Sequence, residues 1–526
     1  MLVAFLLFTS MPEASLSGSL GKLHPSLAPL VTAQPEQMVR VIVQAAGSTD
    51  MASAMAGMGG EFVQDLSIIH ASVGRIPARS LPALAALPSV GWISPDGPVQ
   101  GSGLLERKGG PGDSGGTNAP AANTYLDTLG VRNVWEMGYQ GQGIGIAVID
   151  SGIASGPDFQ ATLNGGSSRI LESRVFGQGL SANDNNGHGT HVAGIAAGNG
   201  SRSAGEFSGI APMANLLSLN ISDGSGMAYE SDTVAAMQWV LDNKATYNIR
   251  VVNLSINSTV ESSYHSSPMN AAAEILWFNG IVVVASSGNK GNTNGPNTSN
   301  AAPANDPFLI TVGAFDEMGD SKLRGDAIAP FTAQGWTDAA IYKPEILAPG
   351  ANIWSVLAPN SIWGKDHPDR VDSTGKYFRA SGTSMAAPMV AGAVALLLQK
   401  EPTLTPDQVK YRLINASRWV GAYPGLDVYK ALTTSTTKSA NTGLTASQLL
   451  WTGSQPAVWQ SGFTWSSVNW NSVNWNSVNW NSGFTWSSVN WNSTYFGYFN
   501  TSTGELSPVP LEDDELPMLF LPMIGN

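Results

Sequence analysis

The sequence predicts an α/β protein built around a parallel β-sheet with helices on both faces. Three observations support this fold class. Between residues 126 and 435, short apolar segments alternate with longer stretches of helical periodicity. The apolar segments are continuous rather than alternating with polar residues, which is typical of strands buried on both faces of a parallel sheet. A change of composition marks this region off at each end, so smaller regions flank the sheet domain.

Length and composition restrict the classes of function. The chain has 526 residues, of which 43% are hydrophobic, and this length suits about two or three domains with one large core. Charged residues make up only 12% and the formal net charge is −13. This balance argues against nucleic acid as a partner, because phosphate binding needs clustered Lys and Arg. The absence of cysteine excludes disulfides, thiol catalysis and cysteine–zinc sites.

The first 20 residues resemble a secretory signal. A short apolar segment at residues 2–8 is followed by small polar residues, although the positively charged start of a typical signal is missing. We therefore expect residues 1–20 to be a signal peptide and the protein to be secreted and extracellular. The alternative is a disordered apolar tail.

Residues 36–98 are predicted to form a small α+β domain. The segments VRVIVQAA, GEFVQDLSIIHASVGRIP and VGWISP indicate strands, and TDMASAMAGM and ARSLPALAALPS indicate helices. The resulting order, β-α-β-β-α-β, is the ferredoxin-like arrangement. Residues 99–125 are rich in Gly, Pro and Ser without periodicity, so they are predicted to be a linker.

The main domain, predicted at 126–435, contains the apolar strands IGIAVID, NLLSLNI, VVNLSI, GIVVVAS and FLITVGA, with helices such as ESDTVAAMQWVLDNKA and PMNAAAEILWFNG between them. The segment 385–398 has 14 residues without a polar side chain, fewer than the roughly 20 that a bilayer span needs. Pro388 is harmless in the first turn of a helix. We therefore expect a buried helix that begins near Thr383 with Ser384 at its N-terminus, and no membrane span.

Residues 436–526 form a region of different composition. It contains half of the 16 tryptophans, repeats SGFTWSSVNWNS twice with VNWNS units between, and ends in an acidic and apolar tail. The five-residue period of the repeat fits neither a strand nor a helix. Exposed aromatic side chains would suit contact with cell-wall or polysaccharide material. The alternative is a loop-rich or solenoid-like region packed against the sheet domain.

Three segments at predicted strand or helix ends supply complementary side chains. The strand IGIAVID ends on Asp150, where a buried carboxylate is costly unless something uses its charge. NGHGTHVAG places His188 at the start of a helix of small residues, and SGTSMAAP supplies Ser384. A hydroxyl nucleophile needs a base to accept its proton, and the base needs a carboxylate to fix its tautomer and stabilise its charged form. These residues predict nucleophilic catalysis by a serine.

The motifs VIDSG, HGTHVAG and GTSMAAP follow one another in the order Asp, His, Ser, which resembles the arrangement of the subtilisin-like serine proteases, the subtilase family. The resemblance covers roughly residues 130–430. It implies a serine endopeptidase of subtilisin-like fold in which Ser384 is the nucleophile, His188 the general base and acid, and Asp150 the orienting carboxylate. It implies no cofactor for catalysis, and substrates that are proteins or peptides.

Further site residues follow from the same resemblance. Asn289, at the end of VVVASSGN, matches the family's oxyanion-hole asparagine, and its alternative role is that of a turn residue. Segments 223–228 and 253–257 match those that flank an extended substrate by strand addition. The family usually has glycine at the place of Asn257, so this side chain would narrow the primary specificity pocket. The residues implied in substrate binding are Gly224, Ser225, Gly226, Ser255, Asn257 and Gly288.

The resemblance also implies that residues 36–98 are an inhibitory propeptide and that the chain is a zymogen. The segment that follows this domain would lead toward the active-site cleft. We therefore expect intramolecular cleavage within the linker, roughly at residues 97–125. The released propeptide would still be an inhibitor of the enzyme.

Other ligand classes have weaker signals. His191 lies three residues after His188, but the glutamate of the H-E-x-x-H zinc motif is missing, so a structural hydrogen-bonding role is expected. In GQGIGIAVIDSG the glycines precede the strand, whereas a dinucleotide-binding fingerprint needs them after it. Asp158 matches a calcium-ligand position of many relatives, although the partner loop GNGSRSAGEFSG lacks the usual ligands. A structural calcium ion at Asp158 is therefore the metal site that the resemblance leaves open.

A different class of function is a binding protein that retained the fold of a protease. Such a protein would normally have lost one of the three catalytic residues or Asn289, and all four are present. The sequence therefore favours an active enzyme, to which the tryptophan repeats would add a binding role.

Overall fold

The computed structural model describes residues 21–46, 50–101, 123–163, 165–177, 181–291, 301–321, 325–337 and 341–450, together with the backbone of β24 (Tyr498–Asn500) and β25 (Glu505–Ser507). The predicted signal peptide at 1–20 and the tryptophan repeats lie outside the described residues, so both stay predictions.

The N-terminal unit begins with α2 (Ala28–Ala33), which was not predicted. It continues with β1 (Met38–Ala45), α3 (Met51–Gly57), β2 (Glu61–Leu66), β3 (Ala71–Pro77), α4 (Leu81–Ala85) and β4 (Val90–Pro95). The strands form an antiparallel sheet in the order β2-β3-β1-β4. Because successive side chains of a strand point to opposite faces, Val41 and Val43 pack into the unit's own core, whereas Ile42 belongs to the apolar cluster of the main domain.

A further strand, β5 (Pro98–Gly101), leads from this unit into the main domain. It lies between β11 (Met227–Tyr229) and β13 (Ile256–Ser258) and is antiparallel to both. The prediction of a linker from residue 99 is therefore wrong for residues 99–101. The Gly- and Pro-rich sequence around them has no strand pattern, and both strands that pair with them belong to the main domain.

The main sheet is largely parallel. All neighbouring strands from β23 to β9 run parallel, while β22 and β16 (Ala327–Ile328) are antiparallel additions at β23 and β15. The prediction of a parallel sheet is confirmed for the centre, and these two additions make the whole sheet mixed. In spatial order the strands are β22 (Arg418–Val420), β23 (Tyr423–Gly425), β19 (Ile346–Pro349), β15 (Ile310–Asp316), β14 (Val282–Ser286), β12 (Ile249–Leu254), β6 (Gly145–Asp150), β10 (Asn215–Asn220) and β9 (Ile170–Val175).

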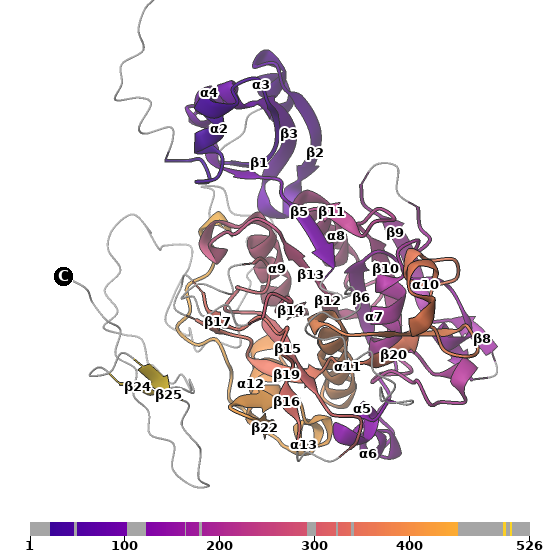
Figure 1. Cartoon of the computed structure of the whole chain (residues 1–526). Helices are drawn as coiled ribbons and strands as arrows, with labels where there is room; N and C mark the ends of the chain where they lie inside the picture. The colour runs from indigo at the N-terminus through magenta and orange to yellow at the C-terminus, as the bar shows by residue number, and fades with distance from the viewer. Residues whose placement is uncertain are drawn as a thin grey trace, which may run out of the picture.

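Helices cover both faces of this sheet, as predicted. The helices α7 (His188–Ala197) and α11 (Thr383–Lys400) pack against each other, and α8 (Glu230–Asn243) packs against α9 (Pro268–Phe278). In Figure 1, α8 and α9 lie between the N-terminal unit and the strands, whereas α11 lies beyond the strands. Shorter elements complete the domain: α5 (Tyr125–Thr128), α6 (Val131–Glu136), α10 (Ile362–Asp366), α12 (Pro406–Asn415), α13 (Val428–Thr433), β7 (Gln160–Thr162), β8 (Gly165–Ser168), β17 (Gly335–Trp336), β18 (Tyr342–Lys343), β20 (Ile353–Val356) and β21 (Tyr377–Ala380).

The helix α11 is the central core helix. Within the part of the chain that the structure describes, it alone is long and apolar enough to cross a bilayer, but 89% of it is buried inside the protein. An apolar helix that is covered on all sides by protein is a core element. The predicted start near Thr383 is confirmed, and Ser384 is the second residue of the helix.

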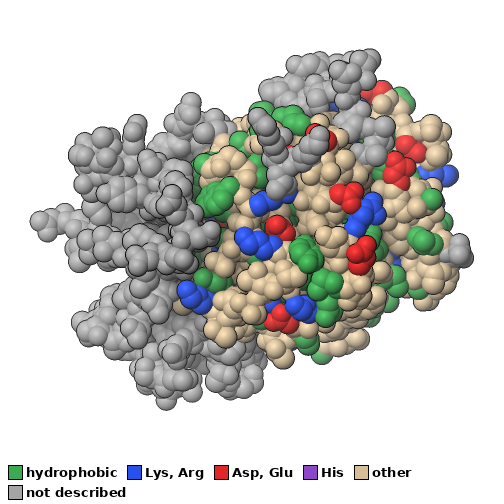
Figure 2. Space-filling view, turned by 90° about the horizontal axis from the view of Figure 1, so that it is seen from below, with side chains coloured by type: hydrophobic (Ala, Val, Ile, Leu, Met, Phe, Trp, Pro, Cys, Tyr) green, Lys and Arg blue, Asp and Glu red, His purple; other side chains and the backbone are tan. Residues whose placement is uncertain are grey.

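The surface is consistent with the charge balance of the chain. On the described part of the face in Figure 2, Lys and Arg side chains alternate with Asp and Glu side chains. A continuous basic surface for a phosphate backbone is therefore not formed on that part of this face.

Candidate active site

The three predicted catalytic residues lie at the carboxyl-terminal side of the parallel strands. Asp150 is the last residue of β6, His188 is the first residue of α7, and Ser384 is in the first turn of α11. In open α/β sheets this edge is where ligands bind. The fold therefore brings together residues that are far apart in the sequence.

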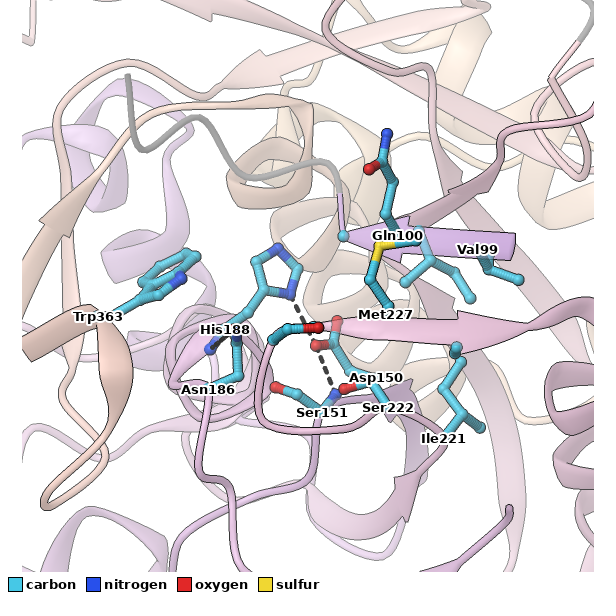
Figure 3. Close-up of a pocket in the computed structure, with 15 residues that line it drawn as sticks. Val99, Gln100, Asp150, Ser151, Asn186, His188, Ile221, Ser222, Met227 and Trp363 are labelled. Carbon is cyan, nitrogen blue, oxygen red and sulfur yellow. Dashed lines mark hydrogen bonds and ion pairs between the residues drawn. The ribbon is translucent and has the colours of Figure 1, made fainter. Parts of the chain in front are cut away.

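Asp150 and His188 form a buried pair. The Nδ1 atom of His188 donates to Oδ1 of Asp150 at 2.7 Å (Figure 3), and the backbone N–H of Ser151 donates to the same oxygen at 2.7 Å. This contact places the proton on Nδ1 and leaves Nε2 as the basic atom. Among the described residues Nε2 has no hydrogen-bond partner, so it is the atom of the ring that is ready to accept a proton.

The charge of Asp150 sets the basicity of His188. Burial by itself lowers the pKa of His188, but the charge of Asp150, the hydrogen bond between the two side chains and the charge of Asp184 together raise this pKa above its ordinary value of 6.5. A raised pKa makes the imidazole a stronger base. The carboxylate therefore both orients His188 and stabilises its protonated form.

A second buried carboxylate, which the sequence analysis missed, holds the start of α7. Asp184 accepts hydrogen bonds from the backbone N–H groups of Gly187 and Thr190 and from the hydroxyls of Thr190 and Ser151, at 2.6–2.9 Å. A carboxylate is favoured where a helix begins because the first N–H groups have no helical partner. The signal was present in the sequence, as an aspartate four residues before His188.

Glycine at position 189 permits the close contact between α7 and the end of β6. A Cβ atom at Gly189 would lie 2.2 Å from the carbonyl oxygen of Gly152 and 3.2 Å from Cβ of Asp150. The N–H of Gly189 also donates to the Ser151 hydroxyl at 2.8 Å. Any side chain at this position would push His188 away from Asp150.

Ser384 is fully buried and points at a backbone carbonyl. Its hydroxyl donates to the carbonyl oxygen of Ser255 at 2.9 Å, and the hydroxyl of Ser255 donates to the carbonyl of Ser384 at 3.1 Å. Ser255 lies between β12 and β13. In this rotamer the Ser384 hydroxyl is directed at Ser255 rather than at His188, so rotation of the Ser384 side chain has to precede any proton transfer to Nε2.

Asn289 lies beside the start of α11. Its Oδ1 atom accepts from the backbone N–H and from the hydroxyl of Thr383, both at 3.0 Å. The Thr383 hydroxyl in turn accepts from the N–H of Gly288 at 3.1 Å. These contacts fix which end of the amide faces the helix. The opposite end, Nδ2, therefore faces away from this contact.

A groove between β11 and β13 leads to His188, and β5 fills it. Gln100 is opposite Met227 on one side and Asn257 on the other. A Cβ atom at Gly101 would lie 3.2 Å from Cε1 of His188, so β5 ends directly on the imidazole ring. A cavity of about 260 Å³ remains beside the strand. Figure 3 shows Val99 and Gln100 on the same side of the cavity as Met227, opposite Trp363.

The residues predicted to bind substrate surround this groove. Ser225 and Gly226 line the cavity, and the carbonyl of Gly224 accepts from Nδ2 of Asn186 at 3.3 Å. Asn257 lies in β13 with its side chain buried, and its Nδ2 donates to the carbonyl of Ser286 in β14 at 3.0 Å.

The Asn257 side chain therefore spans the space between β13 and the end of β14. A Cβ atom at Gly288 would lie 3.3 Å from Oδ1 of Asn257. Glycine at 288 and asparagine at 257 are thus in close contact, and the space between them is already occupied by the amide.

Trp363 is a site residue that the sequence analysis missed. It belongs to α10 and its ring meets the His188 ring edge to face, with centroids 5.3 Å apart. Such contacts favour one orientation of the imidazole. No local pattern predicted this role, because Trp363 and His188 come together only through the tertiary fold.

Two further predicted residues have structural contacts. His191 bonds through Nε2 to the carbonyl of Phe378 at 2.9 Å, and burial lowers the pKa of His191 to about 3. Asp158 is buried, accepts from the hydroxyl of Tyr377 at 2.6 Å and forms an ion pair with Arg202. In this arrangement the guanidinium of Arg202 balances the charge of the carboxylate, and calcium binding at Asp158 stays a prediction from the sequence.

The amino-acid sequence of this chain is similar to the sequences of known proteins. The profile of the subtilase family matches residues 141–448. The serine protease AprX of Bacillus subtilis (strain 168) is 35% identical over 294 residues, which cover 54% of this chain and 64% of AprX. Subtilisin DY of Bacillus licheniformis is 32% identical over 289 residues, which cover 55% of this chain and 88% of that protein.

A solved structure is also similar. The crystal structure of fervidolysin from Fervidobacterium pennivorans, a keratinolytic enzyme related to subtilisin, matches with a TM-score of 0.56 and 22% identity, over 77% of this chain and 62% of fervidolysin. At this identity the match supports the fold alone. The profile match extends over more than half of the chain and includes Asp150, His188 and Ser384. The chain therefore belongs to the subtilase family, the family of the subtilisin-like serine proteases.

Proposed function

We propose that this chain is a serine endopeptidase that hydrolyses peptide bonds through an acyl-enzyme on Ser384. The observation that supports this most is the buried pair of Asp150 and His188, whose Oδ1 and Nδ1 atoms are 2.7 Å apart, at the edge of the sheet where Ser384 lies in the first turn of α11. The groove between β11 and β13 also supports the proposal, because this groove already holds the extended strand β5. An extended substrate would pair with the same two strands.

The proposed reaction begins with rotation of the Ser384 hydroxyl from the Ser255 carbonyl to Nε2 of His188. His188 accepts the proton as Ser384 attacks the substrate carbonyl, and it then donates this proton to the leaving amine. A water molecule repeats the sequence on the acyl ester. The charge of Asp150 stabilises the protonated imidazole in both halves. The scheme uses no cofactor.

Asn289 and the start of α11 would stabilise the negative charge that develops on the substrate oxygen. The Nδ2 group of Asn289 and the backbone N–H of Ser384 are the proposed donors. The dipole of α11 also favours negative charge at its N-terminus. The contacts of Oδ1 with Thr383 support this role, because they keep Nδ2 directed away from the helix.

Covalent labelling tests the proposed reaction directly. A fluorophosphonate probe requires an activated serine, so processed protein should be labelled at Ser384 and peptide mapping should find no other labelled serine. Labelling of a different serine, or no labelling of protein that is correctly folded, would contradict the proposal.

We further propose that the N-terminal unit is an inhibitory propeptide. The position of β5 supports this proposal, because its residues fill the groove and end on His188. A substrate cannot enter while β5 is in place. N-terminal sequencing of active enzyme should give a first residue after Gly101 and no later than about residue 125, the end of the Gly-, Pro- and Ser-rich segment. Active enzyme that begins near residue 20 would contradict it.

Carboxylates are concentrated where this unit meets α8. Asp96 accepts from the backbone N–H and the hydroxyl of Ser231 at 2.8 and 2.7 Å and forms an ion pair with Arg40. Glu230 is covered by the N-terminal unit, since a Cβ atom at Gly97 would lie 3.1 Å from its Oε1 atom. Asp232 lies two residues further along α8. Three carboxylates thus share this contact with the guanidinium of Arg40.

Release of the N-terminal unit is expected to become easier as the pH rises. Burial, opposed by a hydrogen bond from Ser258 and reinforced by the charge of Asp96, raises the pKa of Glu230 from 4.5 to about 8. Burial and the charge of Asp96 also raise the pKa of Asp232 to about 6. A carboxyl group whose pKa is raised in the docked state favours docking fully when the pH is below its ordinary pKa. This contribution is lost as the pH rises through the raised pKa. His24, which contacts Ser262 of the main domain elsewhere, has a pKa that burial lowers, so its effect on docking falls in the more acidic range.

The measurement is the rate at which processed but latent enzyme gains activity, between about pH 6.5 and about pH 8.5. The parent should activate faster at the higher pH. In Glu230→Gln, which keeps the size of the side chain but cannot ionise, the dependence on pH should be clearly weaker. Equal pH dependence in the two proteins would show that Glu230 is not the group responsible.

The side chain of Asn257 is expected to limit the residue that precedes the cleaved bond to a small one. It occupies the space between β13 and the carbonyl of Ser286. Removing it in Asn257→Gly should raise kcat/KM for peptides with a large apolar residue at this position about tenfold or more relative to alanine peptides, since pocket contacts of this size are worth 10- to 200-fold. Profiling both proteins with one peptide library provides the comparison. The same preference in both would exclude Asn257 as the determinant.

The proposals for the location of the enzyme and for the role of the tryptophan repeats rest on the sequence alone. The segment at 1–20 supports secretion. The tryptophan repeats support a second contact, with cell-wall or polysaccharide material, and packing on the catalytic domain is the alternative. If the full chain binds to cell-wall or polysaccharide material and a chain ending at residue 450 does not, the binding role is favoured over packing on the catalytic domain.

A further inference from the structure

The residues after the last helix of the catalytic domain form an ordered arm. This arm, residues 436–450, leaves α13 and crosses the molecule to the side of α9 that faces the N-terminal unit (Figure 1). The first of its anchors is Asn441, whose Nδ2 donates to Oδ1 of Asp407 at 2.7 Å and to the carbonyl of Phe308 at 2.9 Å. The backbone N–H of Ala440 donates to the carbonyl of Asp407 at 3.0 Å.

The second half of the arm is fixed to α9 and the turn before it. The backbone N–H of Ser447 donates to both carboxylate oxygens of Glu274, at 3.0 and 2.8 Å, and Glu274 is fully buried in α9. The Ser447 hydroxyl donates to the carbonyl of His265 at 3.0 Å, and the Tyr264 hydroxyl donates to the carbonyl of Thr445 at 3.0 Å. A buried carboxylate is costly unless it has partners, so these contacts specify one path for the arm.

The arm ends against the N-terminal unit. Gln44, in β1 of that unit, is buried, and its Nε2 donates both to the carbonyl of Ile69 at 3.0 Å and to the carbonyl of Leu449. Leu449 and Leu450 are each 7% exposed and belong to the same cluster of apolar side chains as Ile42 and Ile69. The helix α9 is therefore contacted both by the N-terminal unit and by the end of the arm.

We propose that residues 436–450 form part of the surface on which the N-terminal unit docks and help to retain that unit on the enzyme. The inference rests on the proposed inhibitory role of the unit for its biological meaning, but the contact itself does not depend on catalysis. Removing Leu449 and Leu450 from the contact should loosen the unit. By the reciprocity of coupled contacts, loss of the unit should also loosen the end of the arm.

Hydrogen exchange of the full chain tests this coupling without any proteolysis. The background is Ser384→Ala, which keeps the chain uncleaved if the proposed reaction is correct and changes nothing if it is not. In this background, Leu449→Asp together with Leu450→Asp should speed exchange of the β1 amides about tenfold or more, as expected when part of the burial of a leucine is lost. The milder pair Leu449→Ala and Leu450→Ala should shift exchange in the same direction by less.

The control is Gln448→Asp, which places one negative charge in the same turn but on an exposed side chain. It should leave the exchange of β1 unchanged. Unchanged exchange in α7 and α11 shows that the fold is intact in every variant. If β1 exchanges at the parent rate in both leucine variants, the proposal is wrong. Failure of the labelling experiment at Ser384 would not affect this result.

Discussion

Replacing Ser384 with alanine is expected to abolish peptide hydrolysis while leaving the fold unchanged. The hydroxyl is the proposed nucleophile, and the members of such a triad act as a unit. In subtilisin, a relative of this chain, loss of the serine lowers kcat by about a million-fold, and we expect a loss of the same order. The stability change should be small, because the hydroxyl makes one hydrogen bond, to the carbonyl of Ser255. Such a bond contributes about 1 kcal/mol.

The measurement is kcat for a peptide substrate together with the thermal melting curve. Ser255→Ala is the matched control, since it removes a neighbouring hydroxyl that contacts the carbonyl of Ser384 rather than its side chain. It should retain most of the activity. Hydrolysis by Ser384→Ala at a rate near that of the parent would disprove the assignment of the nucleophile.

Much of the fold could be predicted because the central strands have a local signal. Strands such as β6 and β14 are buried on both faces, so their sequences are continuous apolar runs that differ clearly from the helices between them. The edges of the sheet have no such signal. The strands β16 and β22 are two and three residues long, and they exist only because a neighbouring strand offers its hydrogen-bonding edge.

The same reason explains why β5 was missed. Its sequence, PVQG, contains proline and glycine and stands at the start of a segment that resembles a linker. A strand forms there because β11 and β13 pair with it from both sides, and this information is in the main domain rather than in residues 98–101. The path of the arm at 436–450 was likewise unpredictable, because its anchors Glu274 and Asp407 are distant in sequence.

The catalytic residues could be predicted because each belongs to a compact motif with a fixed place on a strand or helix. The environment of these residues could not be predicted in this way. The rotamer of Ser384, the ring of Trp363 beside His188 and the contact of Asn257 with Ser286 all depend on packing between distant segments. For Asn257 the sequence indicated a narrower pocket, and the structure adds the contact that would narrow it.

Replacing Asp150 with asparagine is expected to lower kcat about ten-thousand-fold, the effect of this change in another serine protease. The volume of the side chain is almost unchanged, so the fold should be kept. What is lost is the charge, together with the acceptor that holds the proton of His188 on Nδ1. An amide N–H that faces Nδ1 favours the tautomer with the proton on Nε2, which cannot accept a proton from Ser384.

The pH dependence of the residual activity provides a second, independent test. His188 must be neutral to act as a base, so activity rises as the pH passes above its pKa. In the parent, burial lowers the pKa of His188, but the charge of Asp150, its hydrogen bond to the ring and the charge of Asp184 together raise this pKa above its ordinary value. Without that charge the effect of burial dominates, the pKa falls and the acid limb of the pH–kcat/KM profile should move to lower pH. An acid limb at the parent position would mean that Asp150 does not set the basicity of His188, whatever the loss in kcat.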